Sequence, residues 1–316
     1  MLKTDFAIIG FPKCGTTSLI ENLKKHSKIN CYRDIGNNES ILFHSVSFYN
    51  IETRKKYEKY LVEGKINGEK NPTYIWNHFS LLNIHKYNPN MKVIICLRNP
   101  VDYIYSWYHQ LYVNSKCGKG ECEHCKNKKD ENGNESGDEN NVKEEPEEQE
   151  EQEEPEEQED FDLNKILSEN GENFEQEETE ESEESEVEEL ESSSEDEENE
   201  ENKHKIISFR KFYLMEKQKD ASYFVNYIIR AIDIFGEENI HYMVQEEYER
   251  DNQLELNKIF RFLGLEEEEL EGLRKFKGER PNGDMDEKTR KYLEHRYKKH
   301  NKNLFKIIGR NIELWE

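Results

Sequence analysis

A short apolar segment followed at once by a glycine-rich loop is the feature that most restricts how this chain can fold. Residues 6–10 (FAIIG) are apolar throughout, which predicts a buried strand. The loop 10–18 reads GFPKCGTTS, and apolar residues then recur at helical spacing to about His26. A helix that begins in such a loop presents free backbone N–H groups and the positive end of its dipole, so the segment predicts an anion-binding loop. The candidate ligands are Lys13, Cys14, Gly15, Thr16, Thr17 and Ser18.

The two glycines have the spacing of the nucleotide-binding loop G-x-x-x-x-G-K-[ST], but two of its chemical groups are missing. Thr16 stands where that loop has its lysine, and Lys13 comes earlier. The next clear apolar strand ends in Leu97-Arg98-Asn99-Pro100, without an acidic residue for Mg²⁺. The sequence therefore argues against a magnesium-dependent nucleotide hydrolase, and we expect no metal in the site. Cys14 fits a small neutral side chain better than a nucleophile.

Strand-like and helix-like segments alternate along the rest of the chain. Helical segments are predicted to follow or precede each apolar strand, which is typical of a parallel sheet covered by helices. The expected fold class is therefore α/β, with one P-loop-like domain around a central parallel sheet. Besides 6–10, strands are expected at 65–70, 92–97 and 239–244, and helices at 52–63, 81–87, 100–113, 223–235, 254–263 and 286–308.

A long acidic segment interrupts this pattern. Residues 126–203 hold 37 acidic and 6 basic residues, whereas the rest of the chain carries a net charge of +6 within a total of −25. Glu, Gln, Asn and Ser offer little surface to bury, so the entropy of ordering the segment stays uncompensated. We expect residues 114–205 to be a disordered insert. It is either a solubilising surface loop or a polyanion that shields a basic cleft.

Other features limit where in the cell the protein is expected and which metals or disulfides it could contain. No apolar run approaches the ~18–20 residues that cross a bilayer, and no export signal is visible, so the chain is expected to be cytoplasmic by default. Six cysteines are too few for a disulfide framework. Cys117, Cys122 and Cys125 have the spacing of three iron–sulfur ligands, but no fourth cysteine follows them. Two alternatives remain. The cysteines could bind zinc with a histidine as a further ligand, or they could lie in a flexible loop that binds no metal.

A second anion site is predicted after the strand 92–97. Arg98 follows this strand directly, and Ser106 comes eight residues later on an expected helix. Open α/β sheets bind ligands at the carboxyl ends of their strands, and a guanidinium with a hydroxyl suits a fixed phosphate. Alone, Arg98 could equally hold a loop by pairing with a carboxylate.

Together, the two motifs resemble the sulfotransferase family that uses 3′-phosphoadenosine 5′-phosphosulfate. Pro12-Lys13-x-Gly15-Thr16-Thr17 is similar to the loop that holds the 5′-phosphosulfate in that family, and Arg98 with Ser106 is similar to its 3′-phosphate site. The stretches 105–110 (YSWYHQ) and 68–74 (GEKNPTY) look most like heparan sulfate and related carbohydrate sulfotransferases. Near the C-terminus, 277–281 (KGERP) resembles their nucleotide-covering loop, which adds Lys277, Gly278 and Arg280 to the candidate donor ligands.

The resemblance implies a division of the chain and a reaction. Residues 1–113 and 206–316 would form the two parts of one sulfotransferase domain, with 114–205 between them. The reaction would move a sulfuryl group from this donor to a glycan or a small-molecule acceptor. We expect no nucleic-acid partner. A P-loop kinase of nucleotides or small molecules, and a non-catalytic nucleotide- or polyanion-binding domain, are the alternatives.

The expected chemistry needs charge stabilisation and a base. Lys13 is the natural group to neutralise the leaving oxygen. Glu39 falls where the resembling family often has its catalytic Glu, although Ile41 and Leu42 depart from the K-E-x-H-F-F-type pattern. The alternatives for the base are His44 and Glu69, and Glu39 itself could be a solvated loop carboxylate. Lys70 is expected to meet the transferring group or an anionic acceptor, unless it is only a surface lysine.

Overall fold

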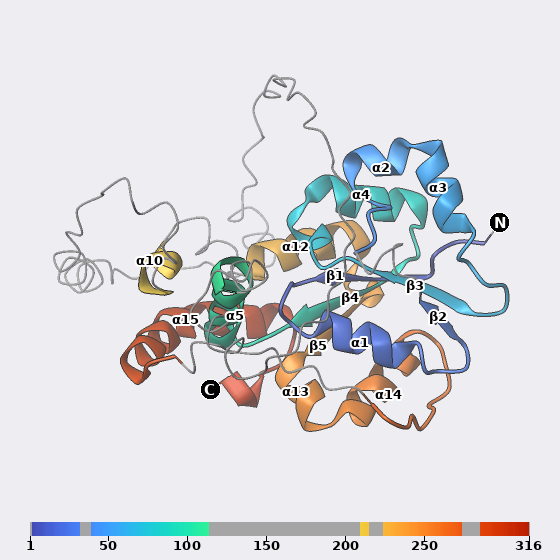
Figure 1. Ribbon diagram of the computed structural model, residues 1–316. Helices are drawn as coiled ribbons and strands as arrows, with labels where there is room; N and C mark the ends of the chain where they lie inside the picture. Colours follow the sequence, from blue (N-terminus) through green and yellow to red (C-terminus); the bar gives the residue numbers. More distant parts are fainter. Residues whose placement is uncertain (1, 32–38, 114–208, 215–223, 274–284, 316) are drawn as a thin grey trace, which may run out of the picture. The chain divides into compact units, whose positions relative to one another are not determined.

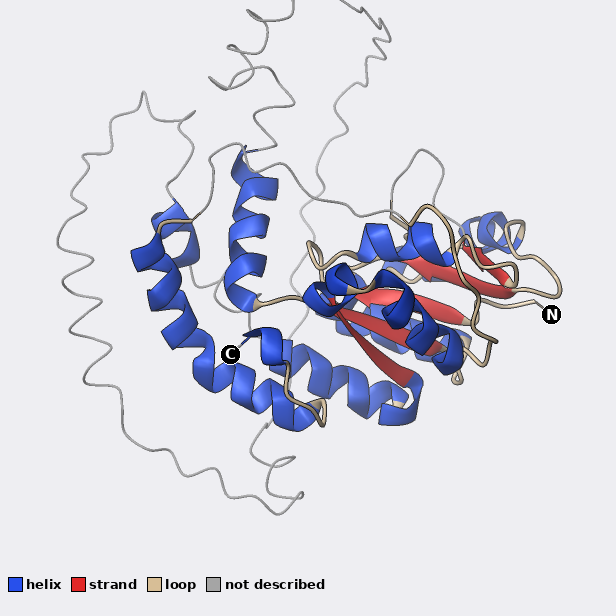
Figure 2. Cartoon of the chain, turned by 90° about the horizontal axis from the view of Figure 1, so that it is seen from below, coloured by secondary structure: helices blue, strands red, loops and turns tan. Residues whose placement is uncertain are grey.

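The central element is a five-stranded parallel sheet with the strand order β2-β3-β1-β4-β5 (Figures 1 and 2). The computed structural model describes residues 2–31, 39–113, 209–214, 224–273 and 285–315, all of which belong to one compact unit. The strands are β1 (Phe6–Gly10), β2 (Ile29–Cys31), β3 (Ile66–Lys70), β4 (Lys92–Leu97) and β5 (Ile240–Val244). The α/β fold with a central parallel sheet is therefore confirmed.

The two strands at the middle of the sheet are its most apolar. Every residue of β1 is buried, and β4 is buried from Val93 onward. Continuous apolar runs of this kind are typical of strands covered on both faces. Phe6 pairs with Gly68 of β3, and a Cβ atom at Gly68 would lie 2.0 Å from Cζ of Phe6. Glycine is thus needed here because the Phe6 ring occupies the space where a side chain would begin.

Helices cover both faces of the sheet (Figure 1). In that view α1 (Thr16–Leu23), α13 (Gln245–Arg250) and α14 (Asn252–Phe262) lie below the strands, and α4 (His78–Tyr87) and α12 (Phe224–Phe235) lie above them. The short helices α2 (Ser45–Tyr49) and α3 (Ile51–Glu58) pack near α4. Asparagine side chains cap the N-termini of α3, α4 and α5 (Pro100–Tyr108) by accepting a backbone N–H, which is the usual role of an N-cap.

Three further helices lie beyond the carboxyl ends of the strands. They are α5 (Pro100–Tyr108), α10 (Phe209–Leu214) and α15 (Glu287–Ile307). Arg290 of α15 donates to Asp102 of α5 at 2.8 Å, which ties the C-terminal helix to the segment after β4. The packing brings the two ends of the sequence, which the acidic segment separates, into one core.

Most predicted elements are present, with local differences that have visible causes. The helix expected over 52–63 ends at Glu58, because Asn67 holds both the N–H and the carbonyl of Val62 in a turn. The helix expected to reach 113 is α-helical only to Tyr108 and continues as a π-helical turn over His109–Val113. Strand β2 was not predicted, since it has three residues and only Ile29 is fully buried. The predicted disordered insert at 114–205 lies outside the described residues.

Candidate functional site

The predicted anion-binding loop joins β1 to α1 at the carboxyl edge of the sheet. Its first turn is fixed to β4 by the N–H of Phe11, which donates to the carbonyl of Cys96 at 2.8 Å. Lys13 and Gly15 both have a positive φ, of 65° and 79°. A left-handed lysine is a strained conformation of the kind that gathers at binding sites. Gly15 is the N-cap of α1, so the first N–H groups of that helix face the loop.

The ammonium group of Lys13 has a partner that the sequence did not reveal. Its Nζ donates to Oε1 of Gln110 at 3.0 Å. Gln110 belongs to the π-helical turn after α5, and such turns often occur at functional sites. Desolvation, followed by repulsion from Arg98, lowers the pKa of Lys13 below its ordinary value.

Arg98 brings the two predicted anion sites together. It follows β4, and its Nη1 donates to the carbonyl oxygen of Lys13 at 3.1 Å. The next residue, Asn99, caps α5 by accepting from the N–H of Val101 at 3.0 Å. Ser106 lies half-buried on the same helix. Two motifs 85 residues apart in the sequence therefore meet at one edge of the sheet.

A second cluster of charged groups lies beside the loop. The Nζ atom of Lys70, at the end of β3, donates to Oγ1 of Thr17 at 3.1 Å and to Oε1 of Glu39 at 2.5 Å. The Lys70 side chain is 3% exposed, whereas that of Glu39 is 42% exposed. The buried lysine thus links the exposed carboxylate to the first turn of α1. The alternative of a plain surface lysine at position 70 is wrong.

The two alternative bases are less suited to reach a substrate. Glu69 is fully buried, and its Oε2 accepts from the hydroxyl of Ser40 at 2.6 Å. Nε2 of His44 lies 3.2 Å from the amide nitrogen of Asn71, which can only donate, so Nε2 acts as the acceptor. Desolvation lowers the pKa of His44 below its ordinary value. Glu39 is more accessible than Glu69, since 42% of its side chain is exposed.

The remaining loop residues are mostly turned inward. Cys14, Thr16 and Ser18 are all buried. Burial raises the pKa of the Cys14 thiol well above its ordinary value, which agrees with a neutral side chain rather than a nucleophile. The Ser18 hydroxyl forms a hydrogen bond with Tyr248 of α13. Thr16 and Ser18 can offer backbone N–H groups to an anion more readily than their side chains, whereas the N–H of Cys14 donates to the carbonyl of Phe11 at 3.3 Å.

Three further residues, Gln245, Trp76 and Trp107, were given no role of their own from the sequence. Gln245 follows β5, and its side chain is the nearest group to the position a Cβ of Gly15 would take, at 3.6 Å. Trp76 and Trp107 are half-buried and meet edge to face, with ring centroids 5.5 Å apart. Knowledge of the strand order would have indicated Gln245 as a candidate site residue, since β5 lies beside β4 and both strands end on the side of the sheet where the loop lies.

Some predicted residues fall outside the described part of the chain. These are Lys277, Gly278 and Arg280 of the expected nucleotide-covering loop, and Cys117, Cys122 and Cys125 of the expected metal spacing. Among the described residues, no group of three or more His, Cys, Asp or Glu side chains is placed to hold a metal ion.

The family model for a sulfotransferase domain matches residues 3–306 of this chain. The chain belongs to the sulfotransferase family. The match includes both anion-site motifs and extends across the acidic segment. A sulfotransferase enzyme, in which a sulfuryl group is transferred, is therefore the function class that family membership supports.

Two individual proteins are similar to this sulfotransferase. A crystal structure of a sulfotransferase from Alicyclobacillus acidocaldarius has a TM-score of 0.57 at 18% identity, covering 100% of this chain and 99% of that one, which shows a shared fold. A bifunctional heparan sulfate N-deacetylase/N-sulfotransferase 1 from Caenorhabditis briggsae is 31% identical over 109 residues. That match covers 34% of this chain and only 13% of the relative's length.

None of the helices in the described ranges combines the length and the apolar character needed to cross a bilayer. The sulfotransferase domain therefore carries no membrane-spanning helix within 2–31, 39–113, 209–214, 224–273 and 285–315.

Proposed function

We propose that this enzyme transfers a sulfuryl group from 3′-phosphoadenosine 5′-phosphosulfate to a hydroxyl or amine of a carbohydrate. The observation that carries the proposal is the hydrogen bond from Arg98 to the carbonyl of Lys13. Through this bond, Arg98, the candidate residue for the 3′-phosphate, lies beside Lys13, the candidate residue for the 5′-phosphosulfate. A donor that carries phosphate groups at both ends requires two such residues close together. Family membership supports the same donor class.

Each group in the site has a role in this proposal. The loop N–H groups and Lys13 bind the 5′-phosphosulfate, and Arg98 with Ser106 binds the 3′-phosphate. As the bond between sulfur and the bridging oxygen breaks, negative charge grows on adenosine 3′,5′-bisphosphate, and Lys13 stabilises it. Among the described loop residues, Lys13 has the only ammonium group beside this position.

Glu39 is the proposed general base. One of its oxygens is bound to Lys70, and Oε2 has no hydrogen-bond partner within the described part of the chain. This oxygen takes the proton that the acceptor hydroxyl or amine loses as its new bond to sulfur forms. Lys70 and Thr17 hold the carboxylate beside the first turn of α1, where the sulfuryl group would arrive.

A carbohydrate acceptor is supported by two observations. Trp76 and Trp107 form a half-buried pair from two segments that also carry candidate site residues, since Trp76 comes six residues after Lys70 and Trp107 follows Ser106, and aromatic rings offer apolar faces for the C–H face of a sugar. In addition, the relative that matches part of this chain is named for its action on heparan sulfate.

The deciding experiment is transfer of radiolabelled sulfate from the donor to a panel of acceptors. The panel holds unsulfated heparosan, chondroitin and a phenolic small molecule, with and without EDTA. Transfer to a glycan that persists in EDTA supports the proposal, and transfer only to the phenol contradicts the carbohydrate acceptor. If the protein binds adenosine 3′,5′-bisphosphate but labels none of the acceptors, the non-catalytic alternative gains the support instead.

A further inference from the structure

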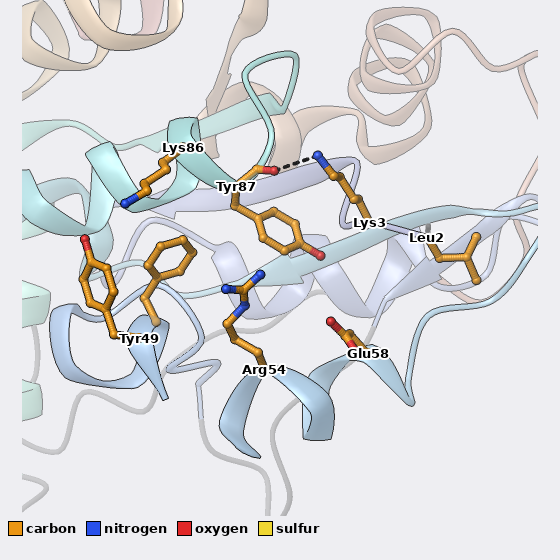
Figure 3. A pocket seen from close by; sticks show the side chains of 8 residues that line it. Leu2, Lys3, Tyr49, Arg54, Glu58, Lys86 and Tyr87 are labelled. Carbon is orange, nitrogen blue, oxygen red and sulfur yellow. Dashed lines mark hydrogen bonds between the residues drawn. The ribbon is translucent and has the colours of Figure 1, made fainter. Parts of the chain in front are cut away.

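A hollow of about 370 Å³ lies near the amino ends of the strands, whereas the candidate site lies at their carboxyl ends. It is lined by residues just before β1, by α2 and α3, and by the last turn of α4 (Figure 3). These segments adjoin the amino ends of β1 and β4, whereas the anion-binding loop follows the carboxyl end of β1. The five residues of β1 separate the two places by about 17 Å at ~3.3 Å per residue. The hollow has the size of a small-ligand pocket, ~300–1,000 Å³.

Three cations line this hollow, each over an aromatic ring, and they come from the segment before β1, from α3 and from α4. Arg54 lies 5.5 Å from the ring centroid of Phe48, Lys86 lies 5.2 Å from that of Tyr49, and Lys3 lies 5.9 Å from that of Tyr87. Such contacts hold a cation in place while leaving its charge available to a ligand.

The cations are not neutralised by carboxylates. None of Lys3, Arg54 and Lys86 forms an ion pair with a residue in the described ranges, and Lys3 is bound only to the carbonyl oxygen of Tyr87, at 3.0 Å. One carboxylate, Glu58, also lines the hollow, so its lining has a net positive charge. Like charges gathered without counterions repel each other, and an anionic ligand would relieve this cost.

The chemistry of the lining favours an acidic sugar over a single phosphate group. No helix N-terminus is among the lining residues, and the helix ends that contribute are C-terminal: Tyr49 of α2, Glu58 of α3, and Lys86 with Tyr87 of α4. Phosphate sites typically use helix N-termini. Here the positive charges are instead spread over three separate segments of the chain, with Tyr49 and Tyr87 beside them (Figure 3). Spaced charges and aromatic rings suit a carboxylated or sulfated saccharide, whose C–H faces pack on the rings.

We propose that this hollow is a second binding site, separate from the candidate active site, for an acidic saccharide unit. It deepens the proposed function, on which it rests, because a glycan chain bound here and at the active site would be held at two points. The site would bind the charged sugar without taking part in sulfuryl transfer.

The test is a lysine-acetylation footprint that needs no turnover, so its failure and the failure of the proposed function are separate results. The full chain, saturated with adenosine 3′,5′-bisphosphate, is acetylated with and without a heparin-derived tetrasaccharide. Acetylation rates at Lys3 and Lys86 are measured by mass spectrometry. We expect both rates to fall at least threefold, and the rate at the exposed Lys55 of α3 to stay unchanged. Neutral maltotetraose should protect none of them.

Matched variants on one helix complete the test. Arg54→Ala should reduce the protection by the tetrasaccharide about three- to fivefold, as expected for an exposed charge pair, whereas Lys55→Ala should not. Unchanged rates at Lys3 and Lys86, or equal protection of Lys55, would overturn the proposal. If Lys3 and Lys86 are already protected without any saccharide, the acidic residues 126–203 become the better candidate for the occupant and the proposal also fails.

Discussion

Arg98 donates a hydrogen bond to the main-chain carbonyl of Lys13, with 3.1 Å between Nη1 and the oxygen. The contact places the end of β4 against the strained turn of the anion-binding loop. Arg98 therefore has two roles in the proposed site, since it supports the loop and offers charge to a 3′-phosphate. Both roles depend on the planar guanidinium, which can address two oxygens at once.

Replacing Arg98 should therefore weaken donor binding before it affects chemistry. Arg98→Ala is expected to raise the Kd for adenosine 3′,5′-bisphosphate by about 10- to 100-fold, because hydrogen bonds to charged groups contribute ~1.5–3 kcal/mol. Arg98→Lys keeps the positive charge but loses the planar guanidinium with its paired N–H donors, so its Kd should lie between those of the wild type and Arg98→Ala. Calorimetric titration measures all three affinities. Arg261→Ala, a half-exposed arginine on α14, is the control, and equal losses in both alanine variants would contradict the assignment.

Lys13 should matter for the rate more than for binding. Lys13→Ala is expected to lower kcat by about 10²–10³, as for the loss of other groups that stabilise charge in a transition state. The wild-type kcat/KM should fall on the alkaline side. Since desolvation lowers the pKa of Lys13, the ammonium loses its charge at a lower pH than an ordinary lysine at 10.5, and the fall should begin correspondingly early. A pH profile without any alkaline fall below that value would argue against this role.

Gln110 is predicted to be a positioning residue for Lys13. Gln110→Glu puts a carboxylate in place of the amide oxygen that accepts from Nζ, and an adjacent negative charge favours the ammonium form. The alkaline fall of kcat/KM should therefore move to higher pH. Gln110→Met keeps the length of the side chain but removes the acceptor, and should not move the fall upward. Identical pH profiles for both variants would show that Gln110 does not act through Lys13.

Glu39 can be tested apart from donor binding. Glu39→Gln retains an oxygen that can accept from Lys70 but cannot take up a proton at pH 7, so kcat should drop by about 10²–10⁴. The affinity for adenosine 3′,5′-bisphosphate should change little. Glu52→Gln, an exposed carboxylate at the start of α3, serves as the control. A loss of less than tenfold in kcat would contradict the assignment of Glu39 as the general base.

The sequence predicted the parts of the fold that local chemistry determines. β4 was predicted from its apolar run with correct bounds, and the loop before α1 from its glycines. The charged contacts among distant residues could not be predicted, because they depend on strand order. Lys70 meets Thr17 only because β3 lies beside β1, and Lys13 meets Gln110 only because α5 ends in a π-helical turn. Neither fact leaves a periodic pattern in the sequence.

The close approach of Phe6 to Gly68 gives a prediction about stability. In Gly68→Ala the new Cβ would overlap the Phe6 ring, so the ring or the strand must shift, and the free energy of unfolding should fall by about 1–3 kcal/mol. Phe6→Leu alone should also destabilise the protein, by leaving a gap in the core. In the double variant the smaller leucine makes room for the alanine, so the combined loss should be less than the sum of the two. Urea unfolding of the four proteins measures this coupling. Strict additivity would mean that the two strands do not pack as β1 and β3 do here, since residues in contact are the ones that depart from additivity.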